Sequence, residues 1–249
     1  MKISIITVVW NNKETIKDAI ESVLSQTYKD IEYIIIDGES TDGTIEIIKS
    51  YGNKITKFVS EQDKGLYDAM NKGIKLATGD VVGILNSDDF YINEFVIEKV
   101  VKTFKEQKVD SVFADLVFVK PENLDKTVRY YDSSKFNPSK FAYGWMPAHP
   151  TFFVKREFYE KYGLFKTDYK IAADYELLIR FLSKYQISYA YLNEIFIKMR
   201  LGGASTQNIK SNYILNKEIM RACKENNIYT NWLMVLSKYP VKLLGLMKK

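Results

Sequence analysis

Residues 4–12 read SIITVVWNN, a run of apolar and β-branched residues that ends in two asparagines. A continuous run of this kind predicts a strand buried on both faces, because a half-buried strand alternates polar and apolar residues. The asparagines mark the point where the strand ends. The same pattern follows at residues 31–38, where IEYIII runs into an aspartate and a glycine. Two such strands indicate a sheet that is covered on both faces.

Expected strands and helices alternate through the first hundred residues. The strands cover residues 4–10, 31–36, 55–59 and 81–85, and the helices cover residues 15–25, 44–49, 66–77 and 93–107. This alternation predicts βαβ units and a parallel sheet with helices on both faces. Polar clusters follow the strands at residues 10–12, 37–42, 61–65 and 86–89. Because parallel strands end at the same edge, where ligands of such sheets bind, we expect the four clusters to meet at one rim.

The second half of the chain has a less regular pattern. Its expected strands cover residues 111–119, 127–131, 151–154, 187–192 and 195–199, and its expected helices cover residues 173–184 and 210–226. Residues 138–150 form a loop rich in aromatic residues and proline. No internal repeat or low-complexity linker divides the chain. We therefore expect one compact α/β domain with a C-terminal extension.

The composition excludes several classes of protein. The net charge of +5, from 36 basic and 31 acidic residues among 249, is too small to indicate a protein that binds nucleic acid. The single cysteine, Cys223, rules out an intrachain disulfide and fits a reducing compartment. The first residues show no signal-peptide pattern, and no apolar run approaches the length of a membrane span. We expect a cytoplasmic globular protein.

Two of the strand-end clusters suit the binding of a nucleotide. A carboxylate in the position of Asp37 can accept hydrogen bonds from a uracil N–H or a ribose hydroxyl, although the same residues also favour a turn. Asn86, Ser87 and Asp88 offer oxygen atoms to a divalent cation, which helps a nucleotide diphosphate to act as a leaving group. A helix-capping turn is the alternative interpretation of this loop, and of Asp89 above all.

Two residues in the second half have the chemistry of catalysts. Asp174 begins an expected helix, where it is either an N-cap or a general base that takes the proton from an attacking hydroxyl. Glu176 is the nearby alternative for the base. His149 is the only histidine and lies between two prolines in residues 146–151. It is either a hydrogen-bonding loop residue or a contact to substrate or metal.

Five segments in this order and spacing resemble a known enzyme family. They are SIITVVWNN at residues 4–12, IIIDGESTDGT at 34–44, EQDKGLYDAMNKGIKLATGD at 61–80, GILNSDD at 83–89 and AADYELLIR at 172–180. Over roughly residues 1–205, the chain resembles the family 2 inverting glycosyltransferases. The likeness is greatest to the bacterial enzymes that build colanic acid, capsule and O-antigen polysaccharides.

This resemblance implies the GT-A fold, an α/β fold with a Rossmann-like, mostly parallel central sheet and helices on both faces. The GT-A domain would cover residues 1–205, with a nucleotide-binding half at 1–105 and an acceptor-side half at 106–205. A helical C-terminal extension would follow at residues 206–249.

The resemblance also implies a hexosyltransferase-type activity. The enzyme would move a sugar from a nucleotide-sugar donor, expected to be UDP-linked, to a hydroxyl of a glycan or lipid-linked oligosaccharide in surface polysaccharide biosynthesis. It would use a divalent cation, Mn or Mg. A nucleotidyltransferase is disfavoured, because the Gly-rich, Arg-containing loop expected after its first strand is missing here. A non-catalytic nucleotide-sugar-binding protein stays open as a further alternative.

By position, the resemblance implies a role for each residue of the site. Nucleotide binding falls to Val8, Asp37, Lys64, Asn86 and Ser87. Metal binding falls to Asp88, and catalysis as the base falls to Asp174. Further expected substrate contacts are His149, Trp145, Arg180 and Arg200, with the two arginines steadying phosphate charge. Residues 202–205 would form a mobile loop that closes on the donor.

The chain departs from the family pattern at two positions. Asn86 replaces the first aspartate of the Asp-x-Asp metal motif, so the site loses one charge. Ala173 stands where many members carry an acid before the base. These departures are what keeps a non-catalytic binding protein among the alternatives.

The C-terminal residues have an unusual charge pattern. Glu225 is the last acidic residue, and lysines lie among apolar and aromatic residues from position 232 to the end. This composition suits a peripheral contact with an anionic membrane surface, at the inner face of the plasma membrane. Packing on the domain or on the second subunit of a homodimer is the alternative. Pro240 excludes one continuous helix in either case.

Overall fold

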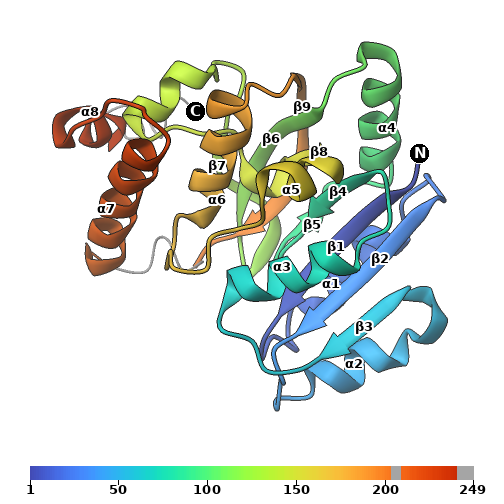
Figure 1. Ribbon diagram of the computed structural model, residues 1–249. Helices are drawn as coiled ribbons and strands as arrows, with labels where there is room; N and C mark the ends of the chain where they lie inside the picture. The colour runs from blue at the N-terminus through green and yellow to red at the C-terminus, as the bar shows by residue number, and fades with distance from the viewer. Residues whose placement is uncertain (203–208, 240–249) are drawn as a thin grey trace.

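The computed structural model describes residues 1–202 and 209–239 (Figure 1). Within these ranges, a mixed sheet of nine strands forms the centre of the molecule. The strands are β1 (Ile3–Val9), β2 (Ile31–Asp37), β3 (Lys57–Ser60), β4 (Val81–Ile84), β5 (Phe90–Tyr91), β6 (Ser111–Lys120), β7 (Asn123–Tyr131), β8 (Phe153–Lys155) and β9 (Tyr189–Arg200). Their order is β3-β2-β1-β4-β8-β6-β9-β5, with β7 paired to β6. The α/β class expected from the sequence is confirmed.

Helices cover both faces of this sheet, so the sheet lies between two hydrophobic cores. The helices are α1 (Ile16–Leu24), α2 (Thr44–Ser50), α3 (Leu66–Leu76), α4 (Val96–Gln107), α5 (Glu157–Tyr162), α6 (Ala173–Ile179), α7 (Ile209–Glu225) and α8 (Trp232–Leu236). Side chains alternate along β1 because successive residues of a strand point to opposite faces. Ile6 and Val8 join the core under α3, α5, α6 and α7, whereas Ile3 and Ile5 join the core under α1, α2 and α4.

The first four strands in the sheet order, β3, β2, β1 and β4, run parallel to one another. Val9, at the end of β1, pairs with Asp37 at the end of β2, and Asp37 pairs with Ser60 at the end of β3. The polar residues that follow these strands therefore start from one edge of the sheet.

The other half of the sheet mixes directions. β8 is antiparallel to β4 and β6, β9 is parallel to β6, and β5 is antiparallel to β9. The two strands expected at residues 187–192 and 195–199 are wrong, because they form the single strand β9. Its register shifts between Leu192, which pairs with Ala114, and Ile195, which pairs with Asp115. This irregularity absorbs two turn-favouring residues without ending the strand.

The C-terminal helices pack on the same face of the sheet as α6. Figure 1 shows α7 running beside α6, with α8 beyond its upper end. Ala222 and Cys223 of α7 and Val235 of α8 are fully buried in the core that contains α6. Cys223 is thus a small core residue of α7. Among the helices that the structure describes, none is both long and apolar enough to cross a membrane.

Candidate active site

Polar residues that follow β1, β2 and β4 are joined by hydrogen bonds at the carboxyl edge of the sheet. The backbone N of Asn11 donates to Ser40 Oγ (2.7 Å), and Asn11 Oδ1 accepts from the backbone N of Thr41 (2.7 Å). The side chain of Asn12 donates to Ser87 Oγ (2.8 Å). Asn11 adopts a left-handed φ of 46°, which asparagine tolerates better than most residues. These bonds confirm that the three clusters meet at one rim.

Asp37 is fully buried at the end of β2. Its Oδ2 accepts hydrogen bonds from Ser60 Oγ (2.6 Å) and from the backbone N of Ser40 (3.1 Å). Its Oδ1 is buried without a partner in the described chain. A buried carboxylate oxygen without a donor costs free energy, so this atom marks a place where an N–H or O–H of a ligand can bind. Val8 packs its side chain in the core under α3, and its contact with a nucleoside stays a prediction.

Trp10 lies at the same rim and leaves 68% of its surface exposed. The sequence pattern predicts Trp10 in the strand-end cluster of residues 10–12 but assigns it no role, although a large aromatic residue directly after a buried strand can indicate a ligand contact. Trp10 and Asp63 approach Gly38 closely: a Cβ at Gly38 would lie 3.4 Å from Trp10 Cδ1 and 2.6 Å from Asp63 Oδ2. Because Gly38 has no side chain, Trp10 and Asp63, which follow β1 and β3, can approach the end of β2 closely.

Lys64 lies in the turn between β3 and α3. Its backbone N donates to Asp68 Oδ2 (3.0 Å), and the backbone N of Gly65 donates to Asp63 Oδ1 (2.7 Å). Gly65 has a φ of 111°, which residues other than glycine rarely adopt. These bonds hold the turn and leave Lys64 exposed at the start of α3. A contact of its ammonium group with base or phosphate stays a prediction.

The loop of residues 86–89, after β4, carries oxygen acceptors that no group in the described chain uses. Asn86 Nδ2 donates to Asp89 Oδ2 (3.0 Å), whereas Asn86 Oδ1 and Asp89 Oδ1 are buried without partners in the described chain. Burial raises the pKa of Asp89 well above its usual range, and the charge of Asp88 adds to this rise. Burial also raises the pKa of Asp88. A bound cation would stabilise the ionised carboxylates and lower both pKa values.

Arg200, at the end of β9, holds this loop in place. Its Nη1 donates to the backbone oxygen of Asp88 (2.6 Å), and its Nη2 forms an ion pair with Asp18 of α1. The guanidinium also lies 5.0 Å from the centroid of the Phe90 ring. Arg200 therefore ties the loop to α1, and its contact with a phosphate stays a prediction. Residues 203–205 of the expected mobile loop lie outside the described residues.

The loop fits a divalent cation that also binds substrate phosphates. In residues 1–202 and 209–239, no cluster of three or more His, Cys, Asp or Glu side chains could hold a metal by itself. Mg²⁺ in nucleotide sites is commonly held by one or two carboxylates together with phosphate oxygens and water. Asp88 supplies such a carboxylate, and the unpartnered Oδ1 of Asn86 supplies a second hard oxygen. The donor set suits a metal shared with a diphosphate.

Asp174 lies in the first turn of α6, where its Oδ1 accepts a hydrogen bond from the backbone N of Tyr175 (2.8 Å). Burial raises the pKa of Asp174 to about 6, and the negative charge of Glu218 adds to the rise. A carboxylate with a pKa near neutral pH accepts a proton from a hydroxyl more readily than an ordinary one. This environment would suit a general base, and the catalytic role of Asp174 stays a prediction.

Tyr67 connects the strand-end rim to the segment that carries Asp174. It is the second residue of α3, directly after the turn that contains Lys64. Its hydroxyl donates to the backbone oxygen of Ile171 (2.5 Å), three residues before Asp174. Burial raises the pKa of Tyr67, and the charge of Asp174 is the next cause. This contact was not predicted, since a tyrosine in an amphipathic helix usually indicates a core residue.

Glu176 of α6 and Arg180, the residue directly after α6, form a buried pair. The guanidinium of Arg180 donates to the backbone oxygens of residues 162–164 at 2.5, 2.8 and 2.7 Å, and to Glu176 Oε2 at 2.9 Å. Its Nε also points to Glu176 at 3.3 Å. Because all five N–H groups are used, we leave Arg180 out of the proposed site. Glu176 is fully buried and also pairs with Lys166 (3.1 Å), so it is not free to replace Asp174 as the base.

His149 is buried in an aromatic cluster that also contains Phe165 and Tyr67. Its ring meets the Phe165 ring edge-on at 5.7 Å, and Phe165 stacks on Tyr67 at 5.7 Å. Burial lowers the pKa of His149 to about 4, so the ring is neutral near pH 7. Trp145 is partly buried in the loop after the short helix η2 (Pro138–Tyr143). Contacts of His149 and Trp145 with substrate stay predictions.

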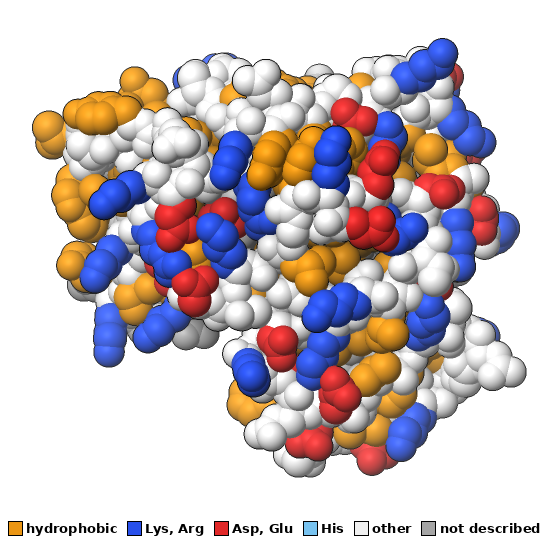
Figure 2. Space-filling model, viewed as in Figure 1, with side chains coloured by type: hydrophobic (Ala, Val, Ile, Leu, Met, Phe, Trp, Pro, Cys, Tyr) orange, Lys and Arg blue, Asp and Glu red, His pale blue; other side chains and the backbone are white. Residues whose placement is uncertain are grey.

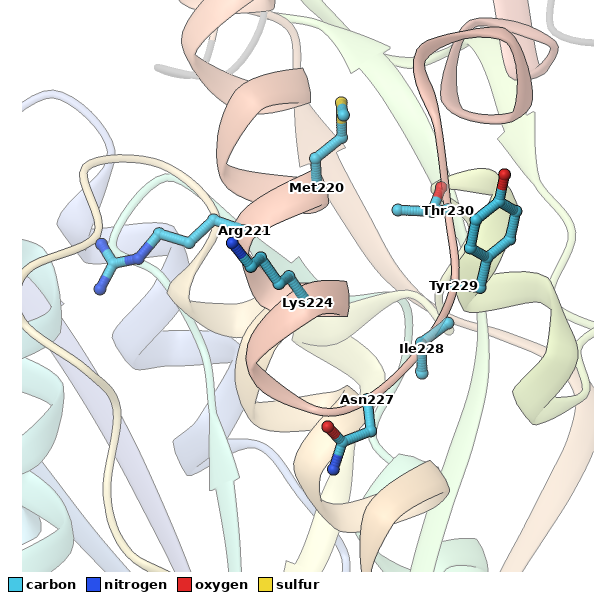
Figure 3. Close-up of a pocket in the computed structure, with 7 residues that line it drawn as sticks. All are labelled: Met220, Arg221, Lys224, Asn227, Ile228, Tyr229 and Thr230. Atoms are coloured by element: carbon cyan, nitrogen blue, oxygen red, sulfur yellow. The ribbon is translucent and has the colours of Figure 1, made fainter.

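An open pocket of about 430 Å³ lies elsewhere, at the end of α7 (Figure 3). Its lining residues are Met220, Arg221, Lys224, Asn227, Ile228, Tyr229 and Thr230. Figure 3 shows Arg221 extending away from the other lining side chains, and Arg221 forms an ion pair with Asp168. None of the strand-end residues lines this pocket, so it is separate from the candidate active site.

Sequence comparisons relate the chain to glycosyltransferases. The family described as Glycosyl transferase family 2 matches residues 4–163. An uncharacterized glycosyltransferase of Rickettsia typhi is 32% identical over 231 residues, which cover 88% of this chain and 70% of that protein. A PGL/p-HBAD biosynthesis glycosyltransferase of Mycobacterium tuberculosis is 25% identical over 223 residues, which cover 88% and 82%.

Solved structures share the fold at low sequence identity. TarS (residues 1–349) of S. aureus, in complex with UDP-GlcNAc, matches with a TM-score of 0.70 at 18% identity, over 92% of this chain and 68% of that one. The mannosyltransferase PcManGT from Pyrobaculum calidifontis, in complex with GDP-Man and Mn²⁺, matches with a TM-score of 0.66 at 18% identity, over 98% and 70%. The GT-A fold expected from the sequence is confirmed.

Proposed function

Because the chain belongs to glycosyl transferase family 2, we propose that it transfers a sugar from a UDP-linked donor to a hydroxyl of a glycan or lipid-linked oligosaccharide, with inversion at the anomeric carbon. One observation carries the proposal. The hydrogen bond from Tyr67 to Ile171 holds the segment that leads to Asp174 against the first turn of α3, beside the strand-end rim. A single displacement needs a donor site and a base within reach of one sugar, and this arrangement provides both.

We place the nucleoside of the donor at the rim around Asp37. The unpartnered, buried Oδ1 of Asp37 would accept a hydrogen bond from the base or the ribose. The exposed ring of Trp10, next to Gly38, offers an apolar face to the base. The similarity to TarS, whose structure contains UDP-GlcNAc, supports UDP as the nucleotide.

In the proposed reaction, Asp174 takes the proton of the acceptor hydroxyl as that oxygen attacks. The new bond forms between this oxygen and the anomeric carbon, on the face opposite the leaving group. The bond from the anomeric carbon to the UDP oxygen breaks, and its electron pair leaves with UDP. The burial that raises the pKa of Asp174 makes it a stronger base than an exposed aspartate.

The departing diphosphate carries charge that must be neutralised. A divalent cation, Mg²⁺ or Mn²⁺, would supply this neutralisation when bound, and Asp88 and Asn86 are the residues that would hold it. Arg200 keeps the backbone of Asp88 in place through its 2.6 Å hydrogen bond. The structural likeness to a mannosyltransferase with bound Mn²⁺ supports this assignment.

A non-catalytic sugar-nucleotide-binding protein is the second candidate, because of Asn86 and Ala173. Ala173 is fully buried in the core under α6, where an ionised acid would be costly. The acid that many family members carry at this position would therefore not fit the packing of this chain. Alanine fits the packing and leaves Asp174 in place. This favours a working catalyst over a degenerate one.

A donor screen followed by a turnover assay tests the proposal. The wild-type protein is heated with a panel of UDP-, GDP- and dTDP-sugars, and a true donor raises the unfolding temperature because it binds only the native state. Release of the nucleotide is then measured for wild type and Asp174→Asn. Binding without release in wild type would indicate the non-catalytic alternative, and stabilisation by GDP-mannose alone would contradict a UDP donor.

We further propose that the enzyme works in surface polysaccharide biosynthesis at the inner face of the plasma membrane. Three apolar residues of α8, Trp232, Leu233 and Leu236, are exposed, and no acidic residue follows Glu225. Figure 2 shows hydrophobic side chains gathered over α8, with basic side chains over the neighbouring α7. Apolar residues flanked by cations suit an anionic lipid surface. A homodimer interface is the alternative outcome of the test given in the Discussion.

A further inference from the structure

Glu218, on α7, binds three consecutive backbone N–H groups. Its Oε1 accepts from Lys170 (2.7 Å), and its Oε2 accepts from Ile171 (2.9 Å) and Ala172 (2.9 Å). These residues belong to no helix or strand, and Ala172 is the N-cap residue of α6. Hydrogen bonds to an ionised acceptor are about twice as strong as neutral ones. One side chain of the C-terminal extension thus holds the three residues that lead into the first turn of α6.

We propose that Glu218 is a positioning residue for Asp174: its carboxylate fixes the backbone that presents Asp174 to the acceptor, and it places a negative charge beside the same segment. The inference rests on the proposed function, in which Asp174 is the general base. It makes α7 a necessary part of the active site, although the family match ends at residue 163.

The geometry shows why this segment needs an anchor on each side. Tyr67 binds the carbonyl oxygen of Ile171 from the direction of α3, and Glu218 binds the N–H groups of the same segment from the direction of α7. The peptide groups before Asp174 are therefore held on both their donor and acceptor sides. Loss of either anchor frees the segment to shift, and a displacement of about 1 Å in a catalytic group can cost on the order of a hundredfold in rate.

The charges around Asp174 support the second part of the proposal. Three titratable groups from three elements interact electrostatically with Asp174: Glu218 of α7, Tyr67 of α3 and Tyr131 of β7. The two tyrosines are neutral near pH 7, since tyrosine ionises only near pH 10 and burial raises the pKa of each further. Glu218 is thus the one anionic neighbour that raises the pKa of Asp174 in the described chain.

Glu225 provides a matched control on the same helix. It also fastens α7 to the segment before Asp174, but through side chains: it accepts from Lys166 (2.7 Å), from the Tyr169 hydroxyl (2.9 Å) and from Arg221 (2.7 Å). It binds none of the N–H groups of residues 170–172. A variant at Glu225 therefore loosens the docking of α7 without removing the proposed positioning contact.

The test compares Glu218→Gln with Glu225→Gln in the full chain. In protein labelled with ¹³C at the aspartate carboxyl groups, the Asp174 signal is assigned by its absence in Asp174→Asn and titrated against pH. We expect Glu218→Gln to lower the titration midpoint of Asp174 and to speed amide hydrogen exchange at residues 170–172, whereas Glu225→Gln leaves both unchanged. With the donor found by the screen, kcat of Glu218→Gln should fall roughly ten- to a hundredfold at an unchanged affinity for UDP.

Glu218→Asp separates position from charge. It keeps the charge near Asp174 but is too short by one methylene group to reach all three N–H groups. We therefore expect the titration midpoint of Asp174 to stay as high as in wild type, while kcat falls. This variant also serves if Glu218→Gln does not fold. Equal effects of Glu218→Gln and Glu225→Gln, or an unchanged midpoint and kcat in Glu218→Gln, would overturn the inference. Normal turnover of Asp174→Asn would instead contradict the proposed function, while the titration and the exchange rates still report on Glu218.

Discussion

The hydroxyl of Tyr67 donates a 2.5 Å hydrogen bond to the backbone oxygen of Ile171, which lies 104 residues further along the chain. Tyr67 follows the turn at the end of β3, beside the strand-end rim, and Ile171 precedes Asp174. The bond therefore joins the donor side of the proposed site to the segment that carries its base. Because the contact is direct and partly buried, we expect its loss to shift the segment that carries Asp174.

Replacing Tyr67 by phenylalanine should lower activity more than stability. The variant removes one partly buried hydrogen bond and should reduce the free energy of unfolding by about 1 kcal/mol. Tyr28→Phe is the matched control, because the Tyr28 hydroxyl also donates to a backbone oxygen, that of Met1 (2.6 Å), away from the rim. We expect kcat to fall about tenfold in Tyr67→Phe only, since the base is displaced. Equal rates in the two variants would contradict this role of Tyr67.

The pH dependence of the reaction should follow Asp174. Its pKa is raised from 3.8 to about 6, and only the ionised carboxylate can accept the proton of the acceptor. In wild type, kcat should rise about tenfold per pH unit below pH 6 and level off above it. Asp174→Asn should lower kcat by about 10²–10⁴-fold and lose this acidic limb. A limb that persists in Asp174→Asn would assign the base to another residue.

The same pKa shift predicts how stability changes with pH. The folded state binds the proton of Asp174 more tightly than the unfolded chain, so protonation stabilises the fold. This contribution is fully present below pH 3.8 and is lost as the pH rises to about 6. Urea unfolding across this window should show a smaller decline in Asp174→Asn than in wild type. The same decline in both proteins would mean that other groups dominate.

Asp37→Asn should weaken nucleotide binding with little effect on the fold. The substitution removes the charge from the unpartnered Oδ1 at the rim, and hydrogen bonds to charged groups contribute about 1.5–3 kcal/mol. We expect the Kd for UDP, measured by calorimetry, to rise roughly ten- to a hundredfold. Asp30→Asn, just before the other end of β2, is the control and should bind UDP as wild type does. Unchanged affinity in Asp37→Asn would move the nucleoside site elsewhere.

Removal of the divalent cation should act through Asp88. Treatment of wild type with EDTA should lower the rate of nucleotide release by roughly a hundredfold or more, and Mn²⁺ or Mg²⁺ should restore it. The reason is that a bound metal stabilises the negative charge on the leaving group by several kcal/mol. Asp88→Asn should be impaired with or without added metal. Full activity of wild type in EDTA would show that Asn86 marks a metal-independent enzyme.

The exposed apolar face of α8 should mediate contact with anionic lipid. We expect the wild-type protein to cosediment with vesicles of phosphatidylcholine and phosphatidylglycerol, and high salt to weaken this binding by screening. Leu233→Glu should reduce binding, since Leu233 is 83% exposed and buries little in the fold. Tyr185→Glu, an exposed aromatic position after α6, is the control. A concentration-dependent dimer that Leu233→Glu disrupts, without vesicle binding, would assign this face to a second subunit.

Much of the fold follows from local sequence patterns. In the parallel half, β1, β2 and β4 are largely apolar runs, and their ends are marked by polar and turn-favouring residues, so both their existence and their direction could be predicted. The interpretation failed at β9, where Asn193 and Glu194 resemble a turn. Pairing with β6 keeps the strand intact through an irregular register, and that pairing is a property of the assembled sheet.

Local patterns along the chain predict the α/β class, the shared rim and the candidates Asp37, Asp88 and Asp174, because hydrophobic periodicity and polar residues at element ends are visible in neighbouring residues. The assembled fold adds that Arg180 is used up by backbone oxygens, that Tyr67 reaches Ile171 and that Glu218 holds the segment before Asp174. In the sequence, Tyr67 resembles a core residue and Glu218 a solvated helix charge. Their roles depend on hydrogen-bond partners 46 or more residues away, which no local pattern specifies.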